Sequence, residues 1–320
     1  MLHSVFLDAG SMGDTSLAPL HSAAIQLHCY PHTTDAQRVE RLQQADIAIV
    51  NKVPLDAAVL AQLPKLKLIC VAATGVNNVD LQAAQQQRIA VCNVRGYANT
   101  AVPQHVFALL LQLSNNIQQY HQAAISGAWA DSPHFCLLHY PVFELAGKTM
   151  LIVGNGALGS ATAKLAQAFG MQVLLAEHPQ ANTCRPGRIP FTEALAQADV
   201  VSLHCPLTPG TERLFNRSTF ALMKPGALLI NTARGGLIDE ADLLSALQQG
   251  QVGGAALDVL TVEPPSQHNP LLTARLPQLI ITPHMAWAST AARQRMVLQL
   301  KANIDAFIQG KVQNQVWPTI

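Results

Sequence analysis

The chain has 320 residues and a hydrophobic fraction of 49%, which is enough for about two domains of ordinary size with separate cores. Its formal net charge of +1, without a long run of one sign, gives no reason to expect nucleic acid or an anionic membrane as a partner. No secretory signal is visible at the N-terminus, and the most apolar helical run is far shorter than the roughly 20 residues that cross a bilayer. We therefore expect a cytoplasmic protein that does not bind membranes.

Short apolar runs alternate with helical patterns over the first hundred residues. The runs lie at 4–8, 25–30, 46–51, 66–74 and 89–94. This alternation is typical of a parallel sheet covered by helices. A long helical pattern follows from Thr100 to about Gln122, and a loop-like stretch containing Trp129, Pro133 and Pro141 comes after it.

A second alternation of the same kind begins at residue 149. Its apolar runs lie at 149–154, 172–177, 199–205, 226–233, 253–259 and 279–284, and a helix is expected from about Ser289 to Gln309. The pattern predicts a second open parallel sheet. The fold class is therefore α/β, with two doubly wound, Rossmann-like or flavodoxin-like domains. The first domain covers residues 1 to about 97 and the second about 98 to 286, and a return of the last helix to the first domain is left open.

A glycine-rich turn opens the second domain, between an expected strand and an expected helix. It consists of Gly154, Asn155, Gly156, Ala157, Leu158 and Gly159. In a dinucleotide-binding turn the first glycine permits the bend, the second lets the backbone approach a pyrophosphate, and the third lets helix and strand pack closely. Such turns also occur for packing alone. The flanking strands, the helix and the acidic Glu177 after the second strand favour cofactor binding.

Glu177 lies 18 residues after Gly159, where a carboxylate can accept hydrogen bonds from the adenosine ribose and repel a 2′-phosphate. This position favours NAD over NADP as the cofactor. Arg185 and Arg188 are close enough in sequence to leave mixed use open.

Three segments near the ends of later strands each carry a residue suited to reducing a keto acid: Arg234, Glu263 and His284. Ligands of open α/β sheets bind at these strand ends. An imidazole can exchange a proton near neutral pH, a carboxylate beside it can orient the ring, and a guanidinium can bind a substrate carboxylate through its planar fork. Each residue alone could be a surface or ion-pair residue. His204 is the rival histidine, and we assign its loop to cofactor contact.

The six cysteines have no C-x-x-C spacing, which argues against a zinc site or a disulfide framework. We expect no bound metal, and we expect the thiols to be reduced and mostly buried.

The segments GNGALG, SLHCPLTPGT, MKPGALLINTARGGLID, ALDVLTVEPP and TPHMAWAS together resemble the D-isomer-specific 2-hydroxyacid dehydrogenase family. The similarity covers nearly the whole chain, including ATGVNNVDL in the first domain. The segments NKVPL, ELAGKT and HMAWAS are most similar to bacterial glycerate dehydrogenases, also called hydroxypyruvate reductases. The chain departs from the usual pattern of the family at two places. The segment VPQH stands where an acidic residue often precedes the histidine, and Asn155 stands where a bulky residue is commoner.

The resemblance implies a catalytic set of Arg234, Glu263 and His284, and it implies that Asp258 holds the nicotinamide carboxamide. It also implies that the cofactor is lined by His204, Cys205 and Pro206 and by Asn231, Thr232 and Ala233, and that the amides of Thr74, Gly75 and Val76 bind the substrate carboxylate. A homodimer is implied as well. So is a discontinuous substrate domain, residues 1–97 with 287–320, into which the NAD domain of residues 98–286 is inserted.

The loops after the first-domain strands offer backbone amides and one cation, Lys52, which suits a small carboxylate such as hydroxypyruvate or glyoxylate. Reduction would yield the D-2-hydroxy acid, D-glycerate or glycolate. A phosphorylated acid would ordinarily need a denser basic cluster. Pyruvate, phenylpyruvate and phosphohydroxypyruvate remain alternative substrates, Lys52 could be a solvated surface residue, and an NAD-sensing corepressor is an alternative function.

Overall fold

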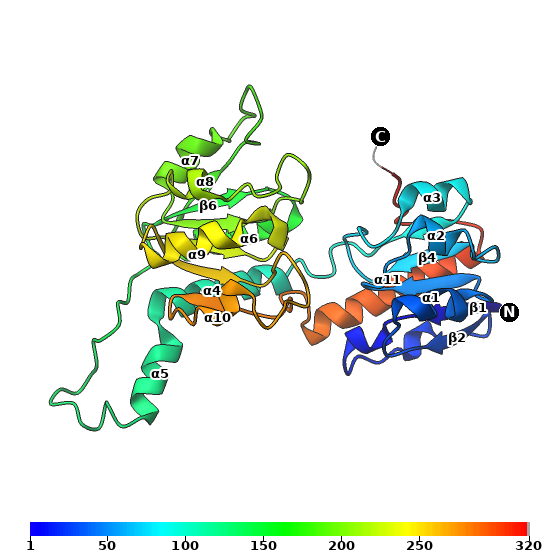
Figure 1. Ribbon diagram of the computed structural model, residues 1–320, viewed down its shortest axis with the longest axis horizontal. Coiled ribbons are helices and arrows are strands. Elements are labelled where there is room, and N and C mark those ends of the chain that lie inside the picture. Colours follow the sequence, from blue (N-terminus) through cyan, green and yellow to red (C-terminus); the bar gives the residue numbers. More distant parts are fainter. Residues whose placement is uncertain (319–320) are drawn as a thin grey trace. The chain divides into compact units, whose positions relative to one another are not determined.

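The computed structural model describes residues 1–318, which form two compact units (Figure 1). Unit 1 comprises Met1–Ala98 together with the C-terminal segment that begins at Ala288, and unit 2 comprises Asn99–Trp287. Each unit contains one sheet, and every strand pair described in the two sheets is parallel. The predicted α/β fold with parallel sheets is therefore confirmed.

The sheet of unit 1 has the strand order β2-β1-β3-β4-β5, which is the flavodoxin-like order. Its strands are β1 (Leu2–Phe6), β2 (Ile25–Cys29), β3 (Ile47–Val50), β4 (Leu68–Val71) and β5 (Ala90–Cys92). Its helices are α1 (Arg38–Leu42), α2 (Ala57–Leu60), α3 (Leu81–Gln86) and α11 (Thr290–Ile308), with 3-10 turns at Ala9–Met12, Ala18–Leu20 and Asp35–Gln37.

Successive side chains of a strand point to opposite faces of a sheet, which explains the two layers of unit 1. Val5, Ala48 and Ile69 pack in one core with buried residues of α1, α2 and α3. The buried residues of α11 are absent from that core, and α11 contacts β4. The last helix therefore covers the opposite face of the unit 1 sheet, and Ser289 caps its N-terminus by accepting a hydrogen bond from the Ala292 amide.

The sheet of unit 2 has the order β11-β10-β9-β8-β6-β7. Its strands are β6 (Thr149–Val153), β7 (Gln172–Leu175), β8 (Val200–Leu203), β9 (Ala227–Asn231), β10 (Val252–Leu257) and β11 (Leu279–Ile281). The strand order reverses between β6 and β8. In an open α/β sheet such a reversal opens a crevice at the carboxyl ends of the strands, where ligands bind.

Helices cover both faces of the unit 2 sheet. The helices of unit 2 are α4 (Ala101–Asn115), α5 (Ile117–Ile125), α6 (Ala157–Ala168), α7 (Phe191–Gln197), α8 (Arg217–Phe220), α9 (Glu240–Gln248) and α10 (Pro270–Thr273), with a 3-10 turn at Gly235–Leu237. One core joins Leu151, Val201 and Leu229 to buried residues of α7, α8 and α9. Helix α4 contacts β9 and β10, and α6 contacts β6 and β7, so they cover the other face.

Two sequence expectations need correction. The single helix expected from Thr100 to about Gln122 is divided at Asn116, whose φ of 50° is left-handed and whose side-chain amide donates to the Pro141 carbonyl. The cysteines are not mostly buried: Cys70 and Cys92 are buried, Cys136 and Cys205 are half-buried, and Cys29, the last residue of edge strand β2, and Cys184, in a loop, are exposed. All six cysteines lie within residues 1–318 and are free thiols.

Helix α5 and the chain that follows it extend away from the unit 2 sheet (Figure 1). We call residues 117–142 the arm. Two hydrogen bonds hold the end of the arm next to its start: Tyr120 donates to the Tyr140 carbonyl, and Asn116 donates to the Pro141 carbonyl. Among the residues that the structure describes, no helix is long and apolar enough to cross a membrane.

Candidate active site

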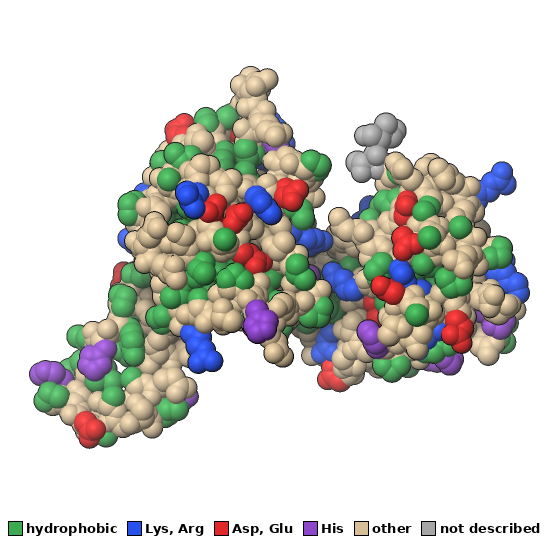
Figure 2. Space-filling view, viewed as in Figure 1, with side chains coloured by type: hydrophobic (Ala, Val, Ile, Leu, Met, Phe, Trp, Pro, Cys, Tyr) green, Lys and Arg blue, Asp and Glu red, His purple; other side chains and the backbone are tan. Residues whose placement is uncertain are grey.

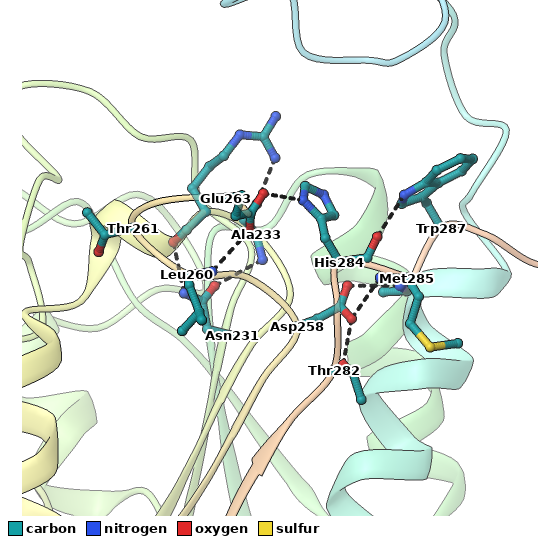
Figure 3. Close-up of polar contacts among 12 residues, drawn as sticks. Asn231, Ala233, Asp258, Leu260, Thr261, Glu263, Thr282, His284, Met285 and Trp287 are labelled. Atoms are coloured by element: carbon teal, nitrogen blue, oxygen red, sulfur yellow. Dashed lines mark hydrogen bonds and ion pairs between the residues drawn. The ribbon is translucent and has the colours of Figure 1, made fainter. Parts of the chain in front are cut away.

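His284 and Glu263 form the central contact of the site (Figure 3). Glu263 lies in the loop after β10 and His284 in the loop after β11, and these strands are parallel neighbours. The Nδ1 atom of His284 lies 2.6 Å from Oε2 of Glu263, and the other oxygen of Glu263 accepts the Leu260 amide at 3.0 Å. This contact fixes the imidazole orientation and leaves Nε2 as the ring nitrogen for a proton exchange with a ligand.

The backbone of His284 is held in an unusual conformation. Its φ of 51° lies in the left-handed region, which is uncommon for a residue with a Cβ. Its amide donates to the carbonyls of Asp258 (2.8 Å) and Thr282 (3.0 Å). A conformation of this kind persists where surrounding contacts enforce it, and such residues cluster at functional sites.

The buried carboxylate of Asp258 supplies most of those contacts (Figure 3). It accepts hydrogen bonds from the Thr282 hydroxyl (2.5 Å) and from the amides of Met285 (2.9 Å) and Ala286 (2.8 Å). Burial raises the pKa of the Asp258 carboxyl, but hydrogen bonds from His105, Thr282 and these amides outweigh it and lower that pKa. Asp258 therefore holds the 282–286 loop as a charged anchor.

Arg234 follows β9, in a turn organised by Asn231. The Asn231 side chain accepts the Ala233 amide at 2.9 Å and donates to the Arg234 carbonyl at 2.8 Å, and Nη1 of Arg234 donates to the Ala233 carbonyl at 2.7 Å. The next residue, Gly235, allows this turn to touch the β10 loop, because a Cβ there would lie 2.0 Å from the Leu260 carbonyl carbon. The glycine thus joins the Arg234 turn to the loop of Glu263.

The glycine-rich turn lies at the strand-order reversal, between the ends of β6 and β8. A Cβ on Gly154 would lie 2.5 Å from the Cys205 amide nitrogen, and a Cβ on Gly159 would lie 2.0 Å from the Gly154 carbonyl oxygen. A Cβ on Gly156 would meet nothing within 4 Å. Two glycines are therefore required for packing, and the third leaves open space at the N-terminus of α6, where backbone amides can bind a phosphate.

Comparisons with known proteins show the family of this chain. The family model for the D-isomer specific 2-hydroxyacid dehydrogenase, NAD binding domain, matches residues 107–286. A glycerate dehydrogenase of Methylorubrum extorquens is 46% identical over 98% of this chain and 98% of its own, and a hydroxypyruvate reductase of Blautia hydrogenotrophica is 39% identical over 88% of each. This chain belongs to the D-isomer-specific 2-hydroxyacid dehydrogenase family.

The solved structure of a Thermus thermophilus protein superposes on the dehydrogenase with a TM-score of 0.87 at 34% identity. The superposition covers 98% of this chain and 100% of that one. Membership of this family makes the dehydrogenase an oxidoreductase that acts on a CH–OH group, with NAD as its cofactor.

Residues predicted to line the cofactor follow β8, at the reversal, and its neighbour β9. The Thr232 hydroxyl is buried and has no hydrogen-bond partner among the residues that the structure describes, as expected for a group that a ligand would satisfy. Burial lowers the pKa of His204 to about 4, and its Nε2 lies 2.9 Å from the Ser202 hydroxyl. His204 is therefore neutral near pH 7. The neighbouring Cys205 has its pKa raised by burial to about 11, so it is an unreactive thiol.

Glu177 follows β7, but its carboxylate is not exposed for a ligand. Arg185 binds both of its oxygens, and Glu177 is only 4% exposed. Hydrogen bonds from the Arg185 side chain, then those from the Arg185 and His178 amides, hold the pKa of the Glu177 carboxyl far below its usual range. Sequence reasoning noted Arg185 as a nearby cation and missed this pair.

The predicted substrate-binding residues belong to unit 1. The Asp8 carboxylate, at the end of β1, accepts hydrogen bonds from the amides of Asn51 (2.8 Å), Lys52 (2.6 Å) and Val53 (3.2 Å). Lys52 is exposed. Asp8 thus fixes the loop that carries Lys52, and it was not singled out from the sequence, although its position after a strand is a usable signal.

The loop of the other three predicted residues follows β4. The Thr74 hydroxyl donates to the Val94 carbonyl at 3.0 Å, and the Thr74 carbonyl accepts the Asn93 amide side chain at 2.7 Å. Gly75 is half-buried, and Val76 packs on the unit 1 core. The loops after β3 and β4 are joined by the Asn78 side chain, which donates to the Val53 carbonyl at 3.1 Å.

Sequence reasoning missed the roles of two further site residues, His105 and Asn231, although Asn231 was expected to line the cofactor. His105, on α4, lies 3.1 Å from the Thr282 hydroxyl and 3.5 Å from Asp258, so it contacts the anchor of the His284 loop. Asn231 organises the Arg234 turn. The signals were present, since His105 stands in VPQH and Asn231 ends a strand. Among residues 1–318, no group of three or more His, Cys, Asp and Glu side chains is placed to hold a metal ion.

Proposed function

We propose that this dehydrogenase reduces a small 2-keto acid, hydroxypyruvate or glyoxylate, to D-glycerate or glycolate with NADH. The observation that carries the proposal is the 2.6 Å contact between Glu263 and His284, which aligns a proton donor at the carboxyl ends of β10 and β11. The substrate class is supported by the similarity to proteins named glycerate dehydrogenase and hydroxypyruvate reductase.

In this proposal the three strand-end residues have separate tasks. His284 donates a proton from Nε2 to the keto oxygen during reduction and removes it during oxidation. Glu263 accepts a hydrogen bond from the Nδ1–H group of His284 and keeps the ring in that orientation. Arg234 binds the substrate carboxylate, since a guanidinium offers two parallel N–H donors to the two oxygens.

NAD, when bound, supplies or accepts the hydride. The residues proposed to hold it are Gly154, Gly156, Ala157, Leu158 and Gly159 at the pyrophosphate, Glu177 near the ribose, and His204, Cys205, Pro206, Thr232, Ala233 and Asp258 along the cofactor. The open space above Gly156 and the unpartnered Thr232 hydroxyl support this placement. We further propose that Asp258 combines two tasks, holding the nicotinamide carboxamide and anchoring the His284 loop.

Unit 1 is proposed to be the substrate-binding domain, so that the chain from about residue 287 returns to the domain formed by residues 1–97. Lys52 and the amides of Thr74, Gly75 and Val76 would bind the substrate carboxylate. The hydrogen bonds from the Lys52 and Val53 amides to Asp8 support this assignment, because a loop held by a buried carboxylate presents its remaining groups in a fixed direction.

We propose that the dehydrogenase is a cytoplasmic homodimer. The arm exposes apolar side chains (Figure 2), among them Phe135 at 92%, Leu138 at 84% and Ile125 at 64%. Exposed apolar side chains gathered on one segment are typical of protein interfaces. Free thiols at all six cysteines suit a reducing compartment. Sedimentation of wild-type protein and of Phe135→Glu tests the dimer, and a monomeric wild type would refute it.

The function is tested by following NADH absorbance with hydroxypyruvate, glyoxylate, pyruvate, phenylpyruvate and phosphohydroxypyruvate. We expect the fastest turnover with hydroxypyruvate. If a bulky or phosphorylated acid is reduced faster, the proposed substrate is wrong, but the proposed transfer of a hydride and a proton to a 2-keto acid still stands. No turnover with any acid would favour an NAD-sensing binding protein instead.

The role of His284 is tested by His284→Ala, with His21→Ala as a matched control because His21 is exposed in unit 1 and lies outside the site. We expect His284→Ala to lose about 100-fold or more in kcat while NADH binding, measured by fluorescence, is retained. Unchanged turnover would show that His284 does not transfer the proton.

A further inference from the structure

The loop between Glu177 and Ile189 leaves the end of β7 and returns to it. The Glu177 amide donates to the Ile189 carbonyl at 2.9 Å, and the Ile189 amide donates to the Leu175 carbonyl at 3.1 Å. Strands β6 and β7 are paired in parallel, with Ile152 opposite Leu175. The returning loop therefore brings Arg185 and Arg188 to the sheet edge that also carries the glycine-rich turn.

The hydrogen-bonding capacity of the Glu177 carboxylate is already filled by this loop. One oxygen accepts the His178 amide (2.8 Å) and Nη2 of Arg185, and the other accepts the Arg185 amide (3.0 Å) and Nε of Arg185 (2.8 Å). An ionised carboxylate offers about four lone-pair positions. A ribose hydroxyl can therefore bind Glu177 only by displacing a donor that is already in place.

The Arg185 side chain, while paired with Glu177, also presents N–H donors to solvent. A guanidinium carries five N–H groups, two of those on Arg185 are used on Glu177, and the other three have no partner among residues 1–318. The side chain is 62% exposed. Arg188 lies 3.8 Å from Glu177, so two guanidinium groups share one carboxylate. The local charge is therefore net positive, which attracts an anion.

We infer that Arg185 sets the cofactor preference of the dehydrogenase: it occupies the carboxylate that would select an unphosphorylated ribose, and its exposed N–H groups bind a 2′-phosphate. The chain therefore binds NADP(H) as well as NAD(H). This inference rests on the proposed placement of the adenosine ribose beside Glu177. Charge-assisted hydrogen bonds between arginine and phosphate are short and strong, which makes the exposed fork of Arg185 suitable.

The inference is tested by calorimetric titration of the whole chain with 5′-ADP and 2′,5′-ADP, which avoids any dependence on turnover. Wild-type protein is expected to bind 2′,5′-ADP at least as tightly as 5′-ADP. Arg185→Gln should weaken 2′,5′-ADP by about tenfold or more and leave 5′-ADP unchanged or tighter, because Glu177 is released for the ribose. Arg217→Gln is the matched control, since Arg217 is exposed and ion-paired to Asp242 elsewhere in unit 2.

Glu177→Gln is the second variant, and it guards against misfolding of Arg185→Gln. It weakens the hold on Arg185, so 2′,5′-ADP should bind several-fold tighter. The inference is wrong if wild type discriminates against 2′,5′-ADP, or if Arg185→Gln weakens both nucleotides equally. Binding of neither nucleotide would overturn the ribose placement and the inference together, whereas binding of 5′-ADP alone would overturn only the inference.

Discussion

Gly235 couples the Arg234 turn to the loop of Glu263, and Gly235→Ala tests this coupling. A Cβ at Gly235 would lie 2.0 Å from the Leu260 carbonyl carbon and 2.4 Å from the Thr261 nitrogen. Ordinary contact begins at 3.4 Å, so one backbone must move by the difference, about 1.4 Å. Because the Leu260 amide donates to Glu263, this movement reaches the contact between Glu263 and His284.

A displacement of about 1 Å at a catalytic group can cost about 100-fold in rate. We therefore expect Gly235→Ala to lower kcat/KM for hydroxypyruvate and NADH by about 100-fold. The strain of overpacking, about 1–3 kcal/mol, should lower Tm by about 5 °C. Steady-state kinetics and thermal melting measure the two effects separately.

The adjacent Gly236→Ala is the matched control. A Cβ there would lie 2.9 Å from a terminal methyl group of Leu207, which is the end of a flexible side chain and can move aside. We expect it to change kcat/KM by less than about threefold. The reasoning is refuted if Gly235→Ala retains near-wild-type activity, or if the two alanine variants lose the same amount.

Three further variants test other contacts. Glu263→Gln removes the charge beside His284 and should lower kcat by about 100-fold with NADH binding unchanged, and an equal loss of NADH binding would contradict the assigned role. Asn231→Ala removes both side-chain hydrogen bonds of the Arg234 turn, so we expect a larger change in KM for the keto acid than in Tm; a change in Tm alone would make Asn231 purely structural. Burial lowers the pKa of His204 from 6.5 to about 4. Between pH 6.5 and pH 4 the imidazole is therefore protonated in the unfolded chain and neutral in the folded one, so the free energy of unfolding falls as the pH drops through this range. His204→Asn should remove that fall, up to about 3 kcal/mol by urea unfolding at several pH values, and an unchanged pH dependence would contradict the neutral state of His204.

Much of the fold could be predicted from the sequence because its signals are local. A run such as 149–154 is continuously apolar, as a strand buried on both faces must be. The division of the helix at Asn116 could not be predicted in this way. Asparagine tolerates the left-handed conformation, but the hydrogen bond that the Asn116 side chain donates goes to the Pro141 carbonyl, which is distant in sequence.

The candidate site was predicted in part for the same reason. Arg234, Glu263 and His284 have the right chemistry and follow successive parallel strands, whose carboxyl ends meet at one sheet edge. The contacts of Asp8, His105 and Arg185 depend on the paths of loops and helices. These paths are set by packing between distant segments, and no local pattern reports them.

The sequence by itself determined the α/β class, the parallel sheets, the glycine-rich turn and the residue types of the site, because apolar periodicity and strand-end position are properties of short segments. The tertiary structure alone decided which groups meet. It paired Glu177 with Arg185, and it aligned His284 on Glu263. A side chain's partner depends on where the chain returns in space, and that is settled only when the whole fold is packed.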